Sequence, residues 1–307
     1  MEEQALEFQK DFTRVPKDVK ASQKINRISL TYTQGVVRTL KQNKAAMISL
    51  GFILFIILVA IFGPIILPDY QKTDLMSTLQ APGGGHWLGT DDLGRDVLTR
   101  LVRGTRTSLI IGFVAETINL LIGMIYGGIS GYLGGKVDMI MMRIIDVIVS
   151  IPQMIIMILL LTVFSASIGT LLFALCITGW TGLARMVRAQ VLSLRENEYA
   201  MAAQVLGASK WRILRTHLLP NTVGPILVNY TMSVPAAIGA EAYLSYLGLG
   251  ISIPEASWGN LLQLGANQFP GSLWLFFTPA IVFALTMLAF NLFGDGLRDA
   301  LDPQMRR

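Results

Sequence analysis

Residues that commonly carry enzymatic chemistry are scarce in this sequence. Among 307 residues there is one cysteine, Cys176, and it lies within an apolar stretch. A single cysteine excludes a disulfide framework and a cysteine-based metal site within the chain. The phosphate-binding pattern Gly-x-x-x-x-Gly-Lys-Ser/Thr is also absent, because Gly134-Gly135-Lys136 is followed by Val137 and lacks the earlier glycine. We therefore predict no catalytic residue, no metal and no bound cofactor in this chain.

Charged residues are scarce as well. They make up 15% of the sequence, against 52% hydrophobic residues, which is too apolar for an ordinary soluble domain. The net charge of +5 is concentrated at the two ends and in one polar insert. This distribution is typical of the cytoplasmic segments of a bilayer protein rather than of a nucleic-acid surface. We predict the lipid bilayer, and no nucleic acid, as a partner.

Long apolar stretches are what the sequence does contain. Six of them are long enough to cross about 30 Å of hydrocarbon as helices. They lie near residues 45–67, 107–129, 139–164, 168–185, 222–249 and 272–294. The first follows a polar tail and lacks a small-residue cleavage motif, so we expect a retained span rather than a signal peptide. The pattern predicts an all-α, multi-pass membrane protein with six transmembrane helices.

The positions of Lys and Arg predict the orientation. Nine precede Ala45 and six lie from Arg185 to Asn221, whereas the loops after the third and fifth spans have none. The five basic residues of the loop after the first span are matched by five aspartates. The positive-inside rule therefore predicts that both termini are cytoplasmic. The same orientation places His86 and His217 on opposite sides of the membrane, which excludes a two-histidine metal site within one chain.

The spans divide the chain into segments. These are a cytoplasmic tail (1–44) with an interfacial helix, the first span (45–67), an extracellular loop (68–106), a five-span core (107–294) with a cytoplasmic insert (186–221), and a second cytoplasmic tail (295–307). In the extracellular loop, apolar residues at helical spacing predict an amphipathic surface helix, whose apolar face could rest either on the membrane or on the neighbouring spans. These residues are Leu93, Val97, Leu98, Leu101 and Val102.

Small residues and prolines mark special positions in the spans. Gly123, Gly127 and Gly131 recur at four-residue spacing, which allows either close helix approach or a local break. Pro152 is expected to interrupt the third span, and Pro235 the fifth. Broken helices tend to line a path, because the freed backbone groups need protein or water to cover them. The alternative is an ordinary proline kink in a packed bundle.

Four ionisable residues lie within the apolar stretches: Glu116, Arg143, Asp146 and Glu241. Burial of such a group costs about 3 kcal/mol or more on insertion scales, so each is a functional candidate. Arg143 lies three residues before Asp146 and near the inner boundary, which favours a local pair. For Glu116 and Glu241, a water-filled pathway and an interhelical hydrogen bond both remain open.

The polar insert between the fourth and fifth spans is the best indication of function. Residues 198–221 are expected to form two short helices, broken at 207–210 and stopped by Pro220. A compact cytoplasmic projection of this kind indicates a contact surface for a partner protein. Four residues are expected to anchor its second helix to the bundle, namely Trp211, Ile213, Leu214 and Leu218. Just before the insert, Arg185 and Arg188 are expected to be interfacial anchors.

The insert resembles a family motif. Ala202-Ala203, three further residues, Gly207 and then Leu219-Pro220 are similar to the EAA motif of the membrane subunits of ABC importers. Three further blocks look like the C-type permease subunit of oligopeptide and dipeptide importers: 86–98, 246–260 and 294–303. The resemblance covers most of the chain from about Thr31 to Pro303. It implies the type I importer permease fold with an extra N-terminal span.

The resemblance also implies partners and site residues. The chain would form half of a pore with a B-type permease in the bacterial inner membrane, fed by an external peptide-binding protein. Two ATPase subunits would bind ATP and Mg and would dock on the insert. The implied ATPase-coupling residues are Glu198, Met201, Ala202, Ala203, Gly207, Leu219 and Pro220. Separately from the resemblance, their place within the apolar stretches makes Glu116, Asp146 and Glu241 candidates for the translocation pathway.

Two positions depart from the motif. Met201 occupies its glutamate position and His217 its isoleucine position, so Glu198, one turn earlier, is expected to supply the acidic contact. Alternatives also remain for the cargo, which could be nickel, opines or glutathione in the same family. Two other classes of protein are also alternatives. An ion-coupled carrier would need paired broken spans. A receptor without transport activity would need a large signalling domain.

Overall fold

The computed structural model describes residues 32–251 and 254–301. Its helices are α3 (Tyr32–Gln42), α4 (Lys44–Ile66), α5 (Val97–Leu133), α6 (Gly135–Val149), α7 (Gln153–Val163), α8 (Ile168–Leu194), α9 (Glu198–Val205), α10 (Lys210–Ile213), α11 (Leu219–Tyr246), α12 (Trp258–Asn267) and α13 (Leu273–Leu301). A short 3-10 turn (Leu75–Ser77) and a π-helix, η2 (Leu214–Leu218), complete them.

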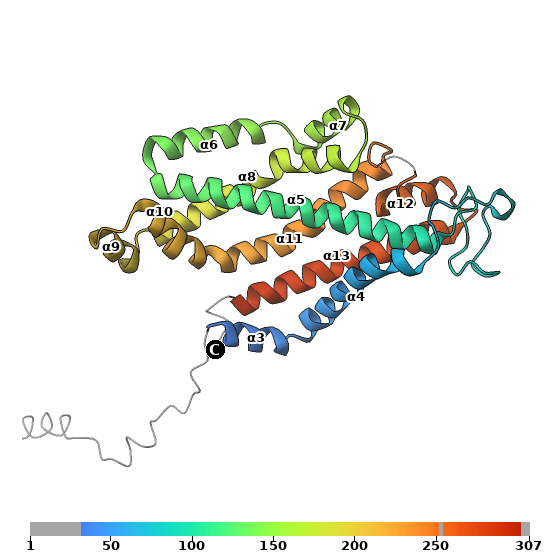
Figure 1. Ribbon diagram of the computed structural model, residues 1–307, viewed down its shortest axis with the longest axis horizontal. Helices are drawn as coiled ribbons and strands as arrows, with labels where there is room; N and C mark the ends of the chain where they lie inside the picture. The colour runs from blue at the N-terminus through green and yellow to red at the C-terminus, as the bar shows by residue number, and fades with distance from the viewer. Residues whose placement is uncertain (1–31, 252–253, 302–307) are drawn as a thin grey trace, which may run out of the picture.

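The long helices run side by side along the molecule (Figure 1). The hairpin of α9 and α10 lies at one end of the bundle, and the loop between α4 and α5 lies at the other, with α12 nearby. Five helices are long and apolar enough to cross a membrane, or up to six if the bent pair α6 and α7 is one span. The predicted all-α membrane fold is therefore confirmed.

The second span begins further out than the sequence indicated. The expected surface helix is not separate, because its residues from Val97 onward are the first turns of the continuous, 37-residue α5. The Asp96 carboxylate caps this helix by accepting a hydrogen bond from the Thr99 amide at 2.9 Å. Val97 and Leu101 are buried in the bundle rather than resting on a membrane surface. An apolar face of this kind has the same spacing whichever surface covers it.

The two expected proline breaks have different outcomes. At Pro152 the chain does break, and α6 and α7 meet at a bend of 69°. At Pro235 it does not, since α11 continues through this residue as well as through Pro225. Val234 and Ile238 on either side of Pro235 are fully buried. Packing of this segment into the protein core keeps it helical despite the missing amide proton.

The closest packing in the bundle joins α5 to α8. A side chain on Gly127 would contact the Ala184 carbonyl, and one on Gly131 would lie 2.7 Å from the Arg188 carbonyl oxygen. Of the two interpretations of the glycine spacing, the structure shows close helix approach. Small residues allow this approach, and dispersion and weak polar contacts then hold helices together in lipid.

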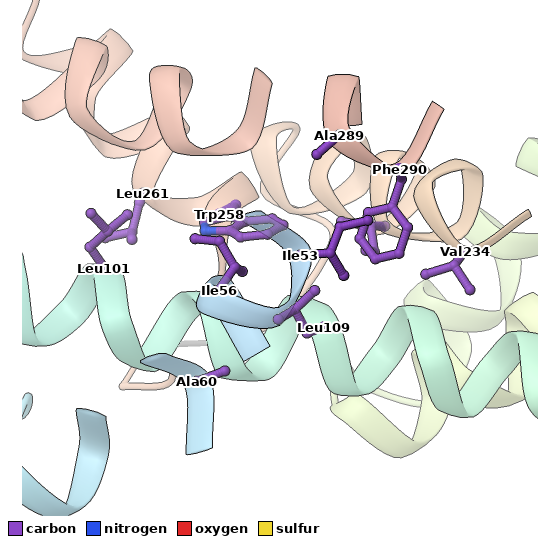
Figure 2. Close-up of a cluster of buried hydrophobic side chains, with 11 residues drawn as sticks. Ile53, Ile56, Ala60, Leu101, Leu109, Val234, Trp258, Leu261, Ala289 and Phe290 are labelled. Carbon is purple, nitrogen blue, oxygen red and sulfur yellow. The ribbon is translucent and has the colours of Figure 1, made fainter. Parts of the chain in front are cut away.

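A second packing centre lies towards the opposite end (Figure 2). Side chains from α4, α5, α11, α12 and α13 converge there, including Ile53, Leu101, Val234 and Phe290. At its centre Trp258 is fully buried, and its indole N–H donates to the Thr105 hydroxyl at 3.1 Å. Because α4 supplies part of this core, the first span is an integral part of the bundle.

Candidate functional site

The hairpin of residues 198–221 is held in one shape by its turn. Gly207 ends α9 with φ +80°, in the left-handed region that favours glycine. Its amide donates to the Gln204 carbonyl at 3.0 Å, and the Ala208 amide donates to the Ala203 carbonyl at 3.0 Å. These two bonds form a Schellman motif. Ser209 then caps α10 by accepting from the Arg212 amide at 3.3 Å.

A buried cluster attaches the hairpin to the bundle. Ala200 of α9 and Ile213 of α10 are buried together with Leu218 of η2. They pack against α8 through Val187 and Val191, among others. Well-packed apolar contacts of this kind leave little freedom for independent motion. The hairpin is therefore a rigid projection of the bundle rather than a linker.

The second helix of the hairpin is not stopped at Pro220, contrary to the sequence-based expectation. Residues 210–246 run as one helical segment, with the π-helical turn η2 directly before α11. In η2 the Leu219 amide donates to the Leu214 carbonyl. Pro220 then lies in the first turn of α11, where a missing amide proton is tolerated. The Asn221 side chain donates to the His217 carbonyl at 2.6 Å, which satisfies one of the freed acceptors.

The tip of the hairpin exposes apolar side chains. Val205 and Leu206 are 88% and 86% exposed, and Met201 is 50% exposed. Trp211 is 58% exposed, so the expectation that it anchors the hairpin to the bundle is wrong, whereas Ile213 is buried as expected. Contiguous exposed apolar residues away from the spans mark an interaction surface. Lys210, Arg212 and Arg215 are exposed beside this tip and add positive charge.

The seven expected coupling residues divide into two groups. Five of them are exposed on the hairpin, namely Glu198, Met201, Ala202, Gly207 and Pro220. Ala203 and Leu219 are half-buried, and Leu219 packs near Gly128 of α5. A pocket of about 390 Å³ opens beside the hairpin, lined in part by Ala200, Met201 and Lys210. The structure thus brings most of this set to one end of the molecule.

Two ion pairs brace α8 against α6. The Arg188 guanidinium donates to both carboxylate oxygens of Asp138. Arg185 donates to Asp146 at 2.8 Å, closer than the 3.9 Å that separates Arg143 from the same carboxylate. The expected Arg143–Asp146 pair is thus present but secondary. Arg185 and Arg188, expected to be interfacial anchors, are bound to acidic partners from another helix.

The three pathway candidates lie on different helices. Glu116 of α5 is half-buried and accepts a hydrogen bond from the Asn119 side chain at 3.1 Å. Asp146 of α6 is half exposed. Glu241 of α11 is fully buried. Within the described part of the chain, no hydrogen bond or ion pair joins any two of these carboxylates.

Glu241 is the centre of a buried polar cluster. Its carboxylate accepts hydrogen bonds from the Ser108 hydroxyl of α5 and the Ser245 hydroxyl of α11, both at 2.8 Å. Ser257, which caps α12, is a third partner. Of the two interpretations left open by the sequence, the geometry favours the interhelical hydrogen bond. It also reveals serines that sequence reasoning missed, since isolated serines carry no pattern.

A second polar contact that sequence reasoning missed lies at the end of the bundle opposite the hairpin. Arg103 of α5 binds Glu255 at 3.2 Å, and the Tyr70 hydroxyl donates to the same carboxylate at 3.1 Å. The Arg103 guanidinium lies 5.0 Å from the centre of the Tyr70 ring, within range of a cation–π contact. Three segments far apart in sequence meet here, which only the fold can bring about.

Comparison with known proteins shows to which family this chain belongs. Residues 120–307 match the family described as binding-protein-dependent transport system inner membrane component. Residues 31–82 match the N-terminal TM domain of oligopeptide transport permease C. The chain belongs to the binding-protein-dependent transport family. The hairpin of residues 198–221 lies within the part of the chain that matches this family.

Curated relatives extend over nearly the whole chain. The dipeptide transport system permease protein DppC of Bacillus subtilis is 48% identical over 285 residues, covering 92% of this chain and 89% of that protein. The oligopeptide transport system permease protein OppC of the same organism is 46% identical, covering 93% and 94%. The oligopeptide permease OppC of Haemophilus influenzae is 44% identical over 276 residues, covering 89% of both.

A solved structure shares the fold of this family member. A chain of the MetNI methionine ABC transporter in an inward-facing conformation superposes with a TM-score of 0.55 and 22% identity. The match covers 67% of this chain and 97% of that one. The type I importer permease fold is therefore confirmed, and a third of this chain lies outside the shared part.

Proposed function

We propose that this chain is the C-type permease subunit of an ATP-driven importer of dipeptides or oligopeptides. It forms half of the translocation pathway, with a B-type permease forming the other half. Two ATPase subunits bind ATP and Mg, and a peptide-binding protein delivers cargo from outside. This chain contributes pathway walls and motion, and no bond-making residues. The curated relatives support the peptide class, since their names combine dipeptide and oligopeptide transport.

The exposed, rigidly rooted hairpin is the observation that carries this proposal. A coupling element must present a surface to another protein and must not bend when it is pushed. Val205 and Leu206 provide the surface, and the cluster around Ala200 and Ile213 provides the rigidity. ATP-driven closure of the ATPases would swing the hairpin together with the bundle, and convert an inward-open cavity to an outward-open one.

The proposed orientation puts the hairpin and both termini in the cytoplasm of a bacterial cell, with the chain in the inner membrane. The excess of Lys and Arg at the hairpin end supports it. The loop between α4 and α5 then faces the binding protein. Glu116 and Asp146 retain exposed surface and are proposed to line the pathway. Glu241 is proposed to position the helices behind that wall, because it has no exposed surface in this chain.

The coupling role is tested at Gly207. A valine there must adopt a positive φ, which costs about 1–2 kcal/mol, although no neighbouring atom would obstruct its side chain. We expect Gly207→Val to lower peptide uptake about fivefold or more in the reconstituted complex, because the hairpin no longer holds its docked shape. Asparagine tolerates the left-handed region, so Gly207→Asn is the matched control and should retain most uptake.

Uptake and ATP hydrolysis should be measured in the same proteoliposomes. The proposal expects the valine variant to assemble normally and to lose the stimulation of hydrolysis by loaded binding protein. Normal stimulated hydrolysis and uptake in that variant would exclude the coupling role. Competition by dipeptides, and none by nickel or glutathione, would support the peptide class.

A further inference from the structure

The helix before the first span has two different faces. In α3, Val36 and Leu40 are half-buried, and the helix packs against α13 and the start of α4. The opposite face is solvent-exposed and carries Arg38 and Lys41, which lie three residues apart on one side of the helix. Because the apolar side of α3 packs on the bundle, the side that carries Arg38 and Lys41 is the one turned towards the surroundings.

The basic side chains of this face have no acidic partner among residues 32–251 and 254–301. Neither Arg38 nor Lys41 makes a side-chain hydrogen bond or ion pair there, and the same holds for Lys44. α3 itself contains no acidic residue. Within the part of the chain that the structure describes, the positive charge of this face is thus not neutralised.

The length of α4 indicates at which level of the membrane the basic face of α3 lies. Helix α4 begins at Lys44 and has 23 residues, so it is about 35 Å long, which is enough to cross about 30 Å of hydrocarbon. Its first residue lies at the hydrocarbon boundary, and α3 ends only two residues earlier. Lys41, in the last turn of α3, is therefore at the level of the lipid headgroups.

The face also offers an apolar contact next to its charges. Val37 is 50% exposed and lies between Arg38 and the apolar side of α3. A shallow groove of about 490 Å³ follows this helix, lined by Thr33, Gln34, Val37, Arg38, Lys41 and Gln42. A phospholipid matches both features, since its phosphate can meet the cations while its glycerol and upper acyl chain lie on Val37.

We propose that α3 binds anionic phospholipid through Arg38 and Lys41, with Lys44 beside them. Zwitterionic lipid carries no net charge and cannot offset the excess positive charge of this face. The site would fix the first span, and through it α13, to the charged leaflet of the membrane. This inference depends on the membrane position of α4 and not on the cargo or on coupling to ATPases.

The test compares lipids retained by the complete, purified importer complex. The complex is equilibrated with phosphatidylcholine containing phosphatidylglycerol, and bound phosphatidylglycerol is measured by native mass spectrometry. Arg38→Gln and Lys41→Gln should each lower its apparent affinity about fivefold, because each cation near the surface contributes about that factor. Gln keeps a helix propensity similar to that of Lys and Arg, so α3 should still form.

Two controls separate this site from a general effect of charge. Lys136→Gln removes one exposed cation outside α3 and should leave phosphatidylglycerol binding unchanged. Arg38→Lys and Lys41→Arg preserve the charges and should retain binding. An equal loss in the Lys136 variant, or undiminished binding after both Gln substitutions, would overturn the proposal and leave a protein partner as the occupant of this face. Uptake by the Gln variants is measured in parallel, so failure here is distinguishable from failure of the importer assignment.

Discussion

At the scale of single residues, two acidic groups of the bundle, Glu241 and Asp138, bind side chains that come from other helices. Glu241 accepts from Ser108 and Ser245, and Asp138 binds Arg188. In hydrocarbon such groups are costly when unpaired, and paired they hold specific helices together. Sequence reasoning identified the intramembrane carboxylate Glu241 as special. It could not identify the partners, because residues distant in sequence become neighbours only when the helices pack.

The serine cluster predicts different outcomes for two substitutions of Glu241. Glu241→Leu removes both acceptors and leaves the Ser108 and Ser245 hydroxyls without their partner, so we expect a loss of about 1–3 kcal/mol in stability. Glu241→Gln keeps an acceptor oxygen, and the serine hydroxyls can turn to accept from its amide. Thermal denaturation of the purified complex should therefore show a clearly lower midpoint for Leu than for Gln. Equal midpoints would argue against a structural role for this cluster.

At the scale of elements, the sequence predicted helices well and their ends less well. Among the described residues, the apolar lengths located the five helices that are long and apolar enough to cross a membrane, and the break at Pro152 was predicted. The start of α5 was misplaced, because the apolar spacing of Val97 and Leu101 does not reveal which surface covers them. Pro220 was misread as a stop, since the sequence contains no sign of the π-helical turn that admits it. In both cases tertiary packing decided the outcome.

The contact between α5 and α8 gives a prediction for an element. A methyl group on Gly127 would meet the Ala184 carbonyl of the facing helix, whereas one on Gly182 of α8 would meet nothing within 4 Å. We expect Gly127→Ala to force the helices apart and destabilise the subunit by about 1–3 kcal/mol. Gly182→Ala is the matched control and should be neutral or slightly stabilising, since alanine favours helix. Denaturation midpoints of the two variants would check this, and similar values would contradict the assigned contact.

At the scale of the whole molecule, both ends of the bundle are tied by long helices. The hairpin continues into α11, and α11 carries Glu241 towards the opposite end, where Ser257 caps the start of α12. Also at that end, Arg103, Glu255 and Tyr70 join three segments. None of these long-range ties can be inferred from local sequence pattern. The resemblance to importer permeases did indicate that opposite ends must act together.

A distance measurement across the complex would test this continuity. Spin labels at Trp211 and Tyr246, both exposed, mark the two ends of the helical segment 210–246. In a Cys176→Ser background we expect their separation to be the same in nucleotide-free and nucleotide-trapped complexes. A change of more than about one helical rise per turn, roughly 5 Å, would show that the segment bends or shifts at η2.

The π-helical turn at residues 214–218 has a mechanical consequence. It carries the chain past Pro220 without a break, so residues 210–246 form one helical segment from the hairpin to the end of α11. In the proposed importer, a tilt of the hairpin would therefore be passed along this segment towards Glu241. The energy of ATP hydrolysis would then reach the far side of the membrane through geometry alone.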